Sequence, residues 1–133
     1  MRITQSLKRA AQLRGGSTAV VDAGRSYSYP ELQERVARLA GLLQSLGVGP
    51  GDRVGMLSLN SESYVCFYFA AIWSGGVMVP LNHRLAAPEL RRVLEDCTPK
   101  VLLYDEHARD RAGLAQDVLP GLKLIYTGQG QGE

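Results

Sequence analysis

Glycine-rich segments are the first place to look for nucleotide chemistry in this sequence, because glycine-rich loops bind phosphates. Gly47, Gly49 and Gly51 follow a segment with helical periodicity and precede an apolar run typical of a strand. A dinucleotide fingerprint needs the opposite order, in which a strand leads through glycines to a helix N-terminus that faces the pyrophosphate. The sequence also contains no G-x-x-x-x-G-K-[ST] segment. We therefore expect no self-contained phosphate-binding loop.

The titratable and nucleophilic side chains form no catalytic pattern either, and the serines lack the G-x-S-x-G elbow of hydrolases,. His83 and His107 have no His, Cys or carboxylate at metal-ligand spacing,. Cys66 and Cys97 fall in apolar helical segments, which is typical of buried thiols,. Six carboxylates lie in predicted turns or on predicted helix faces, namely Asp52, Glu62, Asp96, Asp105, Glu106 and Asp110. Carboxylates at such positions are normally solvated or cap a helix. From the residues alone we predict no catalytic residue and no metal ligand.

Composition indicates one ordinary globular domain, with 45% hydrophobic and 21% charged residues,. The formal net charge of +2 is too small to indicate a nucleic-acid-binding surface,. No apolar run approaches the roughly 20 residues of a transmembrane helix. We expect a cytoplasmic protein with no nucleic-acid partner and no transmembrane segment.

The N-terminal segment is basic, with Arg2, Lys8, Arg9 and Arg14 and no acid before Asp22. An organellar transit peptide has such a pattern. The same segment also suits a short amphipathic helix that lies on the domain with its basic face in solvent. We favour the helix.

Local signals place the helices. Ser28 and Glu31 form a capping-box pattern, with Pro30 in the first turn of a helix that carries Leu or Val at spacings of three and four and stops at Gly47,. Three polar residues fall mostly on the opposite side from these apolar positions, namely Arg35, Arg38 and Gln44. Asp52-Arg53 suits a turn with a charge pair.

Strands alternate with helices along the chain. A further helix is expected after Asn60, another after Pro88 and a weaker one over 108–118. Strands are expected over 17–23, 54–59, 77–81, 101–104 and 122–126. Short connections between them predict an α/β fold, a mainly parallel sheet flanked by helices. We expect residues 1–127 to form one subdomain and 128–133 a flexible tail.

Four segments in this order resemble the opening of AMP-forming acyl-CoA synthetases in the adenylate-forming enzyme superfamily. SYPEL at 28–32 resembles the first core motif, and WSGGVMVPLN at 73–82 resembles the second. GVGPGDRV at 47–54 and LSLNSESY at 57–64 fit the segments that link them. The likeness covers nearly the whole chain, and it implies the N-terminal portion of the large domain of such an enzyme.

The resemblance implies ligase chemistry that these residues cannot complete. Family members activate a carboxylate with ATP and Mg²⁺ to an acyl-adenylate and, in the acyl-CoA branch, transfer the acyl group to CoA. The Ser/Thr/Gly-rich loop, the acidic residues for ribose and magnesium, and the lysine of the C-terminal lid have no counterpart here. We therefore expect both core blocks to be architectural and this chain to be inactive alone.

One residue is a candidate for cofactor binding by resemblance. Arg84 lies in NHRL, where the family often has NPRL, and a basic residue there can lie near the nucleotide end of CoA. The alternative is a solvated arginine. His83 takes the place of the usual proline.

Three interpretations therefore remain open. The preferred one is an N-terminal fragment of a fatty-acyl or aryl-acid CoA ligase, which exposes apolar edges and self-associates. An amino-acid adenylation or luciferase-like member of the superfamily is an alternative. So is a stand-alone, non-catalytic α/β interaction module.

Overall fold

The computed structural model describes residues 3–22, 24–59 and 61–128 of the chain. Its elements follow in the order α1 (Ile3–Leu13), β1 (Thr18–Asp22), β2 (Arg25–Ser28), α2 (Tyr29–Ser45), β3 (Arg53–Leu57), α3 (Glu62–Trp73), β4 (Val77–Pro80), α4 (Ala87–Cys97), β5 (Val101–Tyr104), the 3₁₀ turn η1 (Glu106–Ala108), α5 (Arg109–Val118) and β6 (Lys123–Tyr126). From α2 onward, helices and strands alternate as expected.

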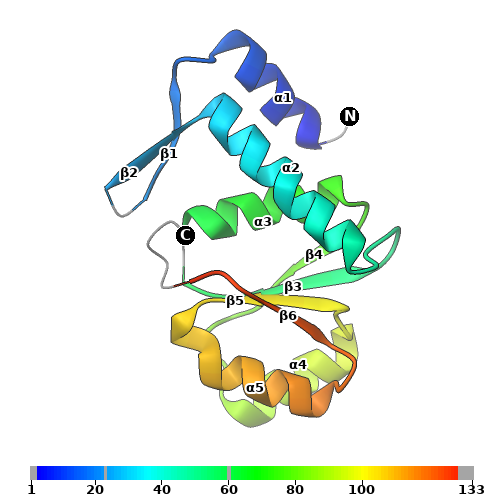
Figure 1. Ribbon diagram of the computed structural model, residues 1–133. Helices are drawn as coiled ribbons and strands as arrows, with labels where there is room; N and C mark the ends of the chain where they lie inside the picture. Colours follow the sequence, from blue (N-terminus) through cyan, green and yellow to red (C-terminus); the bar gives the residue numbers. More distant parts are fainter. Residues whose placement is uncertain (1–2, 23, 60, 129–133) are drawn as a thin grey trace.

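The main sheet has the strand order β4-β3-β5-β6, and each pair of neighbouring strands is parallel. Helices α1, α2 and α3 lie on one side of it and α4 and α5 on the other (Figure 1). Strands β1 and β2 form a separate antiparallel hairpin beside α2. The predicted α/β fold is confirmed.

Alternation along the strands divides the core in two, because successive side chains of a strand point to opposite faces. Met56 of β3 and Leu103 of β5 face α2 and α3, whereas Leu57 and Leu102 face α4 and α5. All four side chains are at most 1% exposed. A strand covered on both faces needs consecutive apolar residues, which explains the unbroken run in β3.

Helix α2 begins as the sequence predicts. The Glu31 amide donates to Ser28 Oγ at 3.3 Å, and the Ser28 amide donates to Glu31 Oε1 at 2.8 Å. This reciprocal pair satisfies two backbone donors at the helix end. The helix buries Leu32, Val36 and other apolar residues of its inner face.

Helix α1 lies against α2 and α3 rather than apart from them. Leu7 is 3% exposed, so the helix contributes to the core. The Lys8 ammonium lies 5.0 Å from the centre of the Trp73 ring, while Arg9 and Arg14 are exposed. The arrangement agrees with an amphipathic helix lying on the domain.

The connection from α3 to β4 requires two glycines. Gly75 has φ +92°, in the left-handed region,. A Cβ at Gly76 would lie 2.9 Å from Val48 Cγ1 and 3.0 Å from the Asp52 carbonyl oxygen. The Gly-Gly pair of the second core block is therefore a packing requirement.

Two expectations fall partly outside the described residues. The first is the cap of α3, expected at Asn60, which lies outside the described residues. The observed N-cap is Ser61, whose Oγ accepts from the Tyr64 amide at 3.3 Å. Of the expected tail, only Gly128 is described, and its carbonyl accepts from the Glu106 amide at 3.0 Å. The tail itself stays a prediction.

Candidate functional site

The carboxyl ends of β3 and β5 flank the topological switch point, where ligands bind in open α/β sheets. The chain runs from β3 to β4 on one side and then returns to β5 on the other. The carboxylate of Asp105 occupies this point, with its Oδ2 3.0 Å from the Leu59 amide and 3.1 Å from Ser58 Oγ. Its Oδ1 accepts from the Ala108 amide at 3.1 Å. Since these protein donors already serve both oxygens, Asp105 ties the two strand ends together.

Burial of that carboxylate was not predicted. Asp105 is 3% exposed and Ser58 is 2% exposed. Of the two roles left open for it, solvated or capping, Asp105 has the capping one, as the N-cap of η1. A buried carboxylate with three donors is a structural element of the fold.

A second buried polar group lies between α2 and α3, where Glu62 and Arg35 form an ion pair. The Glu62 side chain is fully buried, and Arg35 is 24% exposed. The guanidinium also lies 4.9 Å from the centre of the Tyr27 ring, which links the pair to the β1–β2 hairpin. The hairpin is tied a second time by Asp22, whose Oδ2 accepts from the Glu62 amide at 2.9 Å.

The prediction that Glu62 is solvated or capping is wrong, and Arg35, expected mostly on the side opposite the apolar positions, is paired with it. Glu62 opens a helix whose remaining residues are almost all apolar or aromatic and which is covered by α2 and the hairpin. A helix that is apolar on all sides is a buried helix, so the one acid in ESYVCFYFAAIW needed a buried cation. That composition is the signal that could have identified the pair.

The electrostatics of this pair agree with a structural role. Burial lowers the pKa of Arg35, but the hydrogen bond and the negative charge of Glu62 outweigh it, so that the pKa is raised. Burial, together with the Glu62 charge, raises the pKa of the Cys66 thiol to about 12. A thiol of this kind is not a nucleophile at neutral pH. The expected buried thiol is thus observed at Cys66, whereas Cys97 is only half-buried.

The glycine-rich loop before β3 is held by charged side chains. Asp52 Oδ2 accepts from the Gly49 amide at 2.8 Å and from Lys100 Nζ at 3.2 Å, and Lys100 also donates to the Gly47 carbonyl at 2.9 Å. The Gly49 hydrogen bond and then Lys100 lower the pKa of Asp52. A carboxylate at this position disfavours a phosphate. The expected turn is present, but the expected Asp52–Arg53 charge pair is wrong, since Arg53 donates instead to the Cys97 carbonyl at 2.8 Å.

Arg84, the candidate CoA contact, lies just after β4 at the carboxyl edge of the sheet. Its amide donates to Asn82 Oδ1 at 2.9 Å, which fixes the turn. Its side chain is exposed and forms no hydrogen bond or ion pair with any residue the structure describes. None of the carboxylates named in the sequence analysis forms an ion pair with Arg84.

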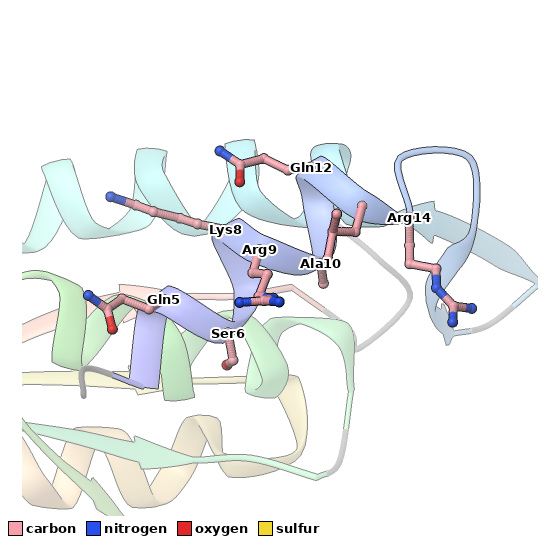
Figure 2. A pocket seen from close by; sticks show the side chains of 8 residues that line it. Gln5, Ser6, Lys8, Arg9, Ala10, Gln12 and Arg14 are labelled. Atoms are coloured by element: carbon pink, nitrogen blue, oxygen red, sulfur yellow. The ribbon is translucent and has the colours of Figure 1, made fainter.

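Two hollows of the described surface are candidate binding places. The depression shown in Figure 2 is lined by residues of α1 and its end alone, from Gln5 to Arg14, so it has one wall. A smaller cavity of about 280 Å³ lies between α2 and the ends of β5 and β6 and is lined by Arg35, Ser63 and Thr127, among others.

In the described part of the chain, no group of three or more His, Cys, Asp or Glu residues could hold a metal ion. Within residues 3–22, 24–59 and 61–128, no helix combines the length and apolar character that crossing a bilayer requires.

Known proteins share both the sequence and this architecture. A feruloyl-CoA synthase of Amycolatopsis sp is 45% identical over 108 residues, which are 80% of this chain and 22% of that protein. A long-chain-fatty-acid–CoA ligase of Mycobacterium tuberculosis is 40% identical over 77 residues, 58% of this chain and 15% of the ligase. The crystal structure of a benzoate CoA ligase from Burkholderia xenovorans LB400 superimposes with a TM-score of 0.88 at 26% identity, covering 96% of this chain and 26% of that one.

These matches have two consequences. The chain spans about a fifth of the length of the curated relatives it matches. The family model of the AMP-binding enzymes matches residues 7–130, nearly the whole chain. The expected resemblance is confirmed, and the chain belongs to the AMP-binding enzyme family.

Proposed function

We propose that this chain forms the N-terminal scaffold of an AMP-forming ligase that joins a fatty or aromatic carboxylic acid to CoA. The family match over residues 7–130 carries the proposal. The names of the relatives cover both acid classes, since one is a feruloyl-CoA synthase and another a long-chain-fatty-acid–CoA ligase. In such a ligase the acid attacks ATP to give an acyl-adenylate and pyrophosphate, and the acyl group then passes to CoA. Two free cysteines support a reducing, cytoplasmic setting,.

In this proposal the chain positions other residues and performs no step itself. Adenylation needs preorganised donors and a metal ion around the phosphates. Asp105, Glu62 and Asp52 are already bound to protein groups, so none of them supports such a role. Residues outside this chain would bind ATP and Mg²⁺.

Carboxylate-dependent ATP–pyrophosphate exchange tests this division of labour. We expect no exchange by the 133-residue chain with benzoate, ferulate or dodecanoate. We expect exchange by a longer product of the same reading frame that carries a Ser/Thr/Gly-rich loop. Exchange by the short chain would refute the scaffold role, and its absence from the longer product with all three acids would refute the ligase.

Arg84 is proposed to contact a phosphate of CoA. An uncommitted guanidinium at the carboxyl edge of the sheet is well suited to a phosphate,. In the active ligase, Arg84→Gln should raise the KM for CoA about tenfold and leave the KM for ATP unchanged, since one charged hydrogen bond contributes about 1.5 kcal/mol or more. Arg91→Gln on α4, another exposed arginine, is the matched control. Equal effects of the two substitutions would refute a specific contact.

Self-association of the isolated chain is also proposed. Strands β4 and β6 end the described sheet on either side, and Val77 and Tyr126 on them are 47% and 43% exposed. Open edges with apolar side chains favour pairing with another copy. Sedimentation velocity should detect dimers that Val77→Lys weakens. A monomer at all accessible concentrations would contradict this part of the proposal.

A further inference from the structure

The structure brings the two histidines of the chain together, although 23 residues separate them in the sequence. His83 lies in the connection after β4, and His107 lies in η1 after β5. The ring centroids are 5.5 Å apart, with an angle of 76° between the planes. Because β3 lies between β4 and β5 in the sheet, the two rings meet across the carboxyl end of β3.

Both imidazoles are available for a ligand. His107 is exposed and His83 is half-buried, so solvent reaches the pair. Among the residues the structure describes, neither ring has a hydrogen bond or an ion pair. In a folded protein, a ring nitrogen without a protein partner is a candidate ligand atom.

The backbone on each side of the pair is fixed. The turn that carries His83 is closed by the hydrogen bond from the Arg84 amide to Asn82 Oδ1. The turn that carries His107 is closed by the hydrogen bond from the Ala108 amide to Asp105 Oδ1. With both turns held, the rings can turn toward a shared ligand by side-chain rotation, which costs little compared with ordering a loop.

The distance matches a shared metal ion. Zinc binds imidazole nitrogen at about 2.0–2.1 Å, and an ion bound by one nitrogen of each ring holds the two ring centroids roughly 5 to 6 Å apart. Imidazole favours Zn²⁺, Ni²⁺ and Cu²⁺, whereas Mg²⁺ and Ca²⁺ prefer oxygen ligands. We propose that His83 and His107 form a two-imidazole site for a divalent transition-metal ion, which links the connection after β4 to the one after β5.

Among the described residues, no His, Cys, Asp or Glu adds a third ligand to this pair. Glu106, the nearest carboxylate in sequence, accepts from Arg109 at 2.7 Å and from Tyr126 at 2.9 Å, so it is committed elsewhere. Water would complete the coordination. The exposed Arg84 next to His83 disfavours a cation, which sets the affinity below that of a site with three or four protein ligands.

A titration of the tag-free chain with Ni²⁺ tests the proposal, since every histidine signal comes from one of these two residues. In proton NMR, both imidazole signals should broaden together, with one ion bound per chain. His83→Ala and His107→Ala should each weaken binding at least tenfold, because each leaves a single ligand. Thermal denaturation should give a saturable rise in Tm with Ni²⁺ or Zn²⁺ and none with Mg²⁺.

Controls separate this site from other metal ligands. The half-buried Cys97 thiol is the soft ligand that could compete with the imidazoles,. If the two histidines hold the ion, Cys97→Ser should leave Ni²⁺ binding unchanged. Independent broadening of the two signals, or binding that survives in both histidine variants, would overturn the proposal. So would the absence of any response, which would leave the pair an aromatic contact.

Discussion

Replacing Gly76 by alanine tests the claim that the second core block is a packing requirement. The added Cβ would lie 2.9 Å from Val48 Cγ1, 3.0 Å from the Asp52 carbonyl oxygen and 3.3 Å from the Ala71 carbonyl oxygen. Val48 is 5% exposed and packs in the core cluster, so a shift of its side chain disturbs buried neighbours. The two oxygens are equally constrained, since Asp52 O accepts from the Val77 amide at 2.7 Å and Ala71 O accepts from the Gly76 amide at 2.9 Å.

The expected loss of stability follows from two opposing effects. Adding a methyl group to a close-packed site costs about 1–3 kcal/mol. Removing a glycine restricts the unfolded chain, which offsets about 0.4–1 kcal/mol of that loss. The net destabilisation of Gly76→Ala should therefore be about 1–2 kcal/mol.

Gly113 provides the matched control. It lies in α5, and a Cβ there would meet no atom within 4 Å. Gly113→Ala should stabilise the protein by about 0.5–1 kcal/mol, because glycine weakens a helix interior. Urea unfolding followed by far-UV circular dichroism should show midpoints shifted in opposite directions with unchanged m values. A Gly76→Ala protein as stable as the parent would refute the packing argument.

Three further predictions concern the buried and bridging polar groups. Glu62→Gln leaves the Arg35 guanidinium without its counter-charge, so urea unfolding should show a loss of about 2–4 kcal/mol, somewhat below a fully buried pair because Arg35 is 24% exposed,; an unchanged midpoint would contradict the ion pair. The raised pKa of about 12 at Cys66 predicts that iodoacetamide at pH 8.5 modifies Cys97 first, as read by mass spectrometry. The same pKa shift makes a contribution to folding stability that is fully present below the unfolded thiol pKa of about 8.5. This contribution is lost as pH rises toward 12,. The pKa of Asp52 is lowered by the Gly49 N–H and by Lys100. Its contribution to the free energy of unfolding is therefore present above the unfolded pKa of about 3.9 and is lost as pH falls through the lower folded pKa,. Asp52→Asn should flatten the acid side of the plot of stability against pH, and an unaltered plot would exclude this linkage.

The sequence predicted what local interactions determine. The capping box of Ser28 and Glu31 acts within one helical turn, so the start of α2 could be read from four residues. The parallel sheet followed from the alternation of apolar runs and helical periodicity. The family followed from the order of four segments, each short and none of them catalytic.

Interactions between distant segments could not be predicted in the same way. Helical periodicity describes the face of one helix, so it placed Arg35 outward although its guanidinium reaches across to Glu62 of α3. The spacing of His83 and His107 carries no signal, because their contact depends on the order of strands in the sheet. The composition of α3 could have predicted the ion pair, because Glu62 is its one acidic residue in a largely apolar helix.

Two of the carboxylates expected to be solvated or capping connect distant parts of the chain by hydrogen bonds. Asp105 joins the end of β5 to the end of β3, and Asp52 joins the loop before β3 to Lys100 before β5. Each of these groups is satisfied by protein donors, so an incoming substrate would have to displace a hydrogen bond that holds the sheet. Arg84 differs, because its guanidinium has no partner among the described residues and lies at the edge where α/β sheets bind ligands,. The proposed scaffold role agrees with this difference. Asp105 and Asp52 hold the sheet together, whereas Arg84 can contact a phosphate-bearing ligand while other residues perform the reaction.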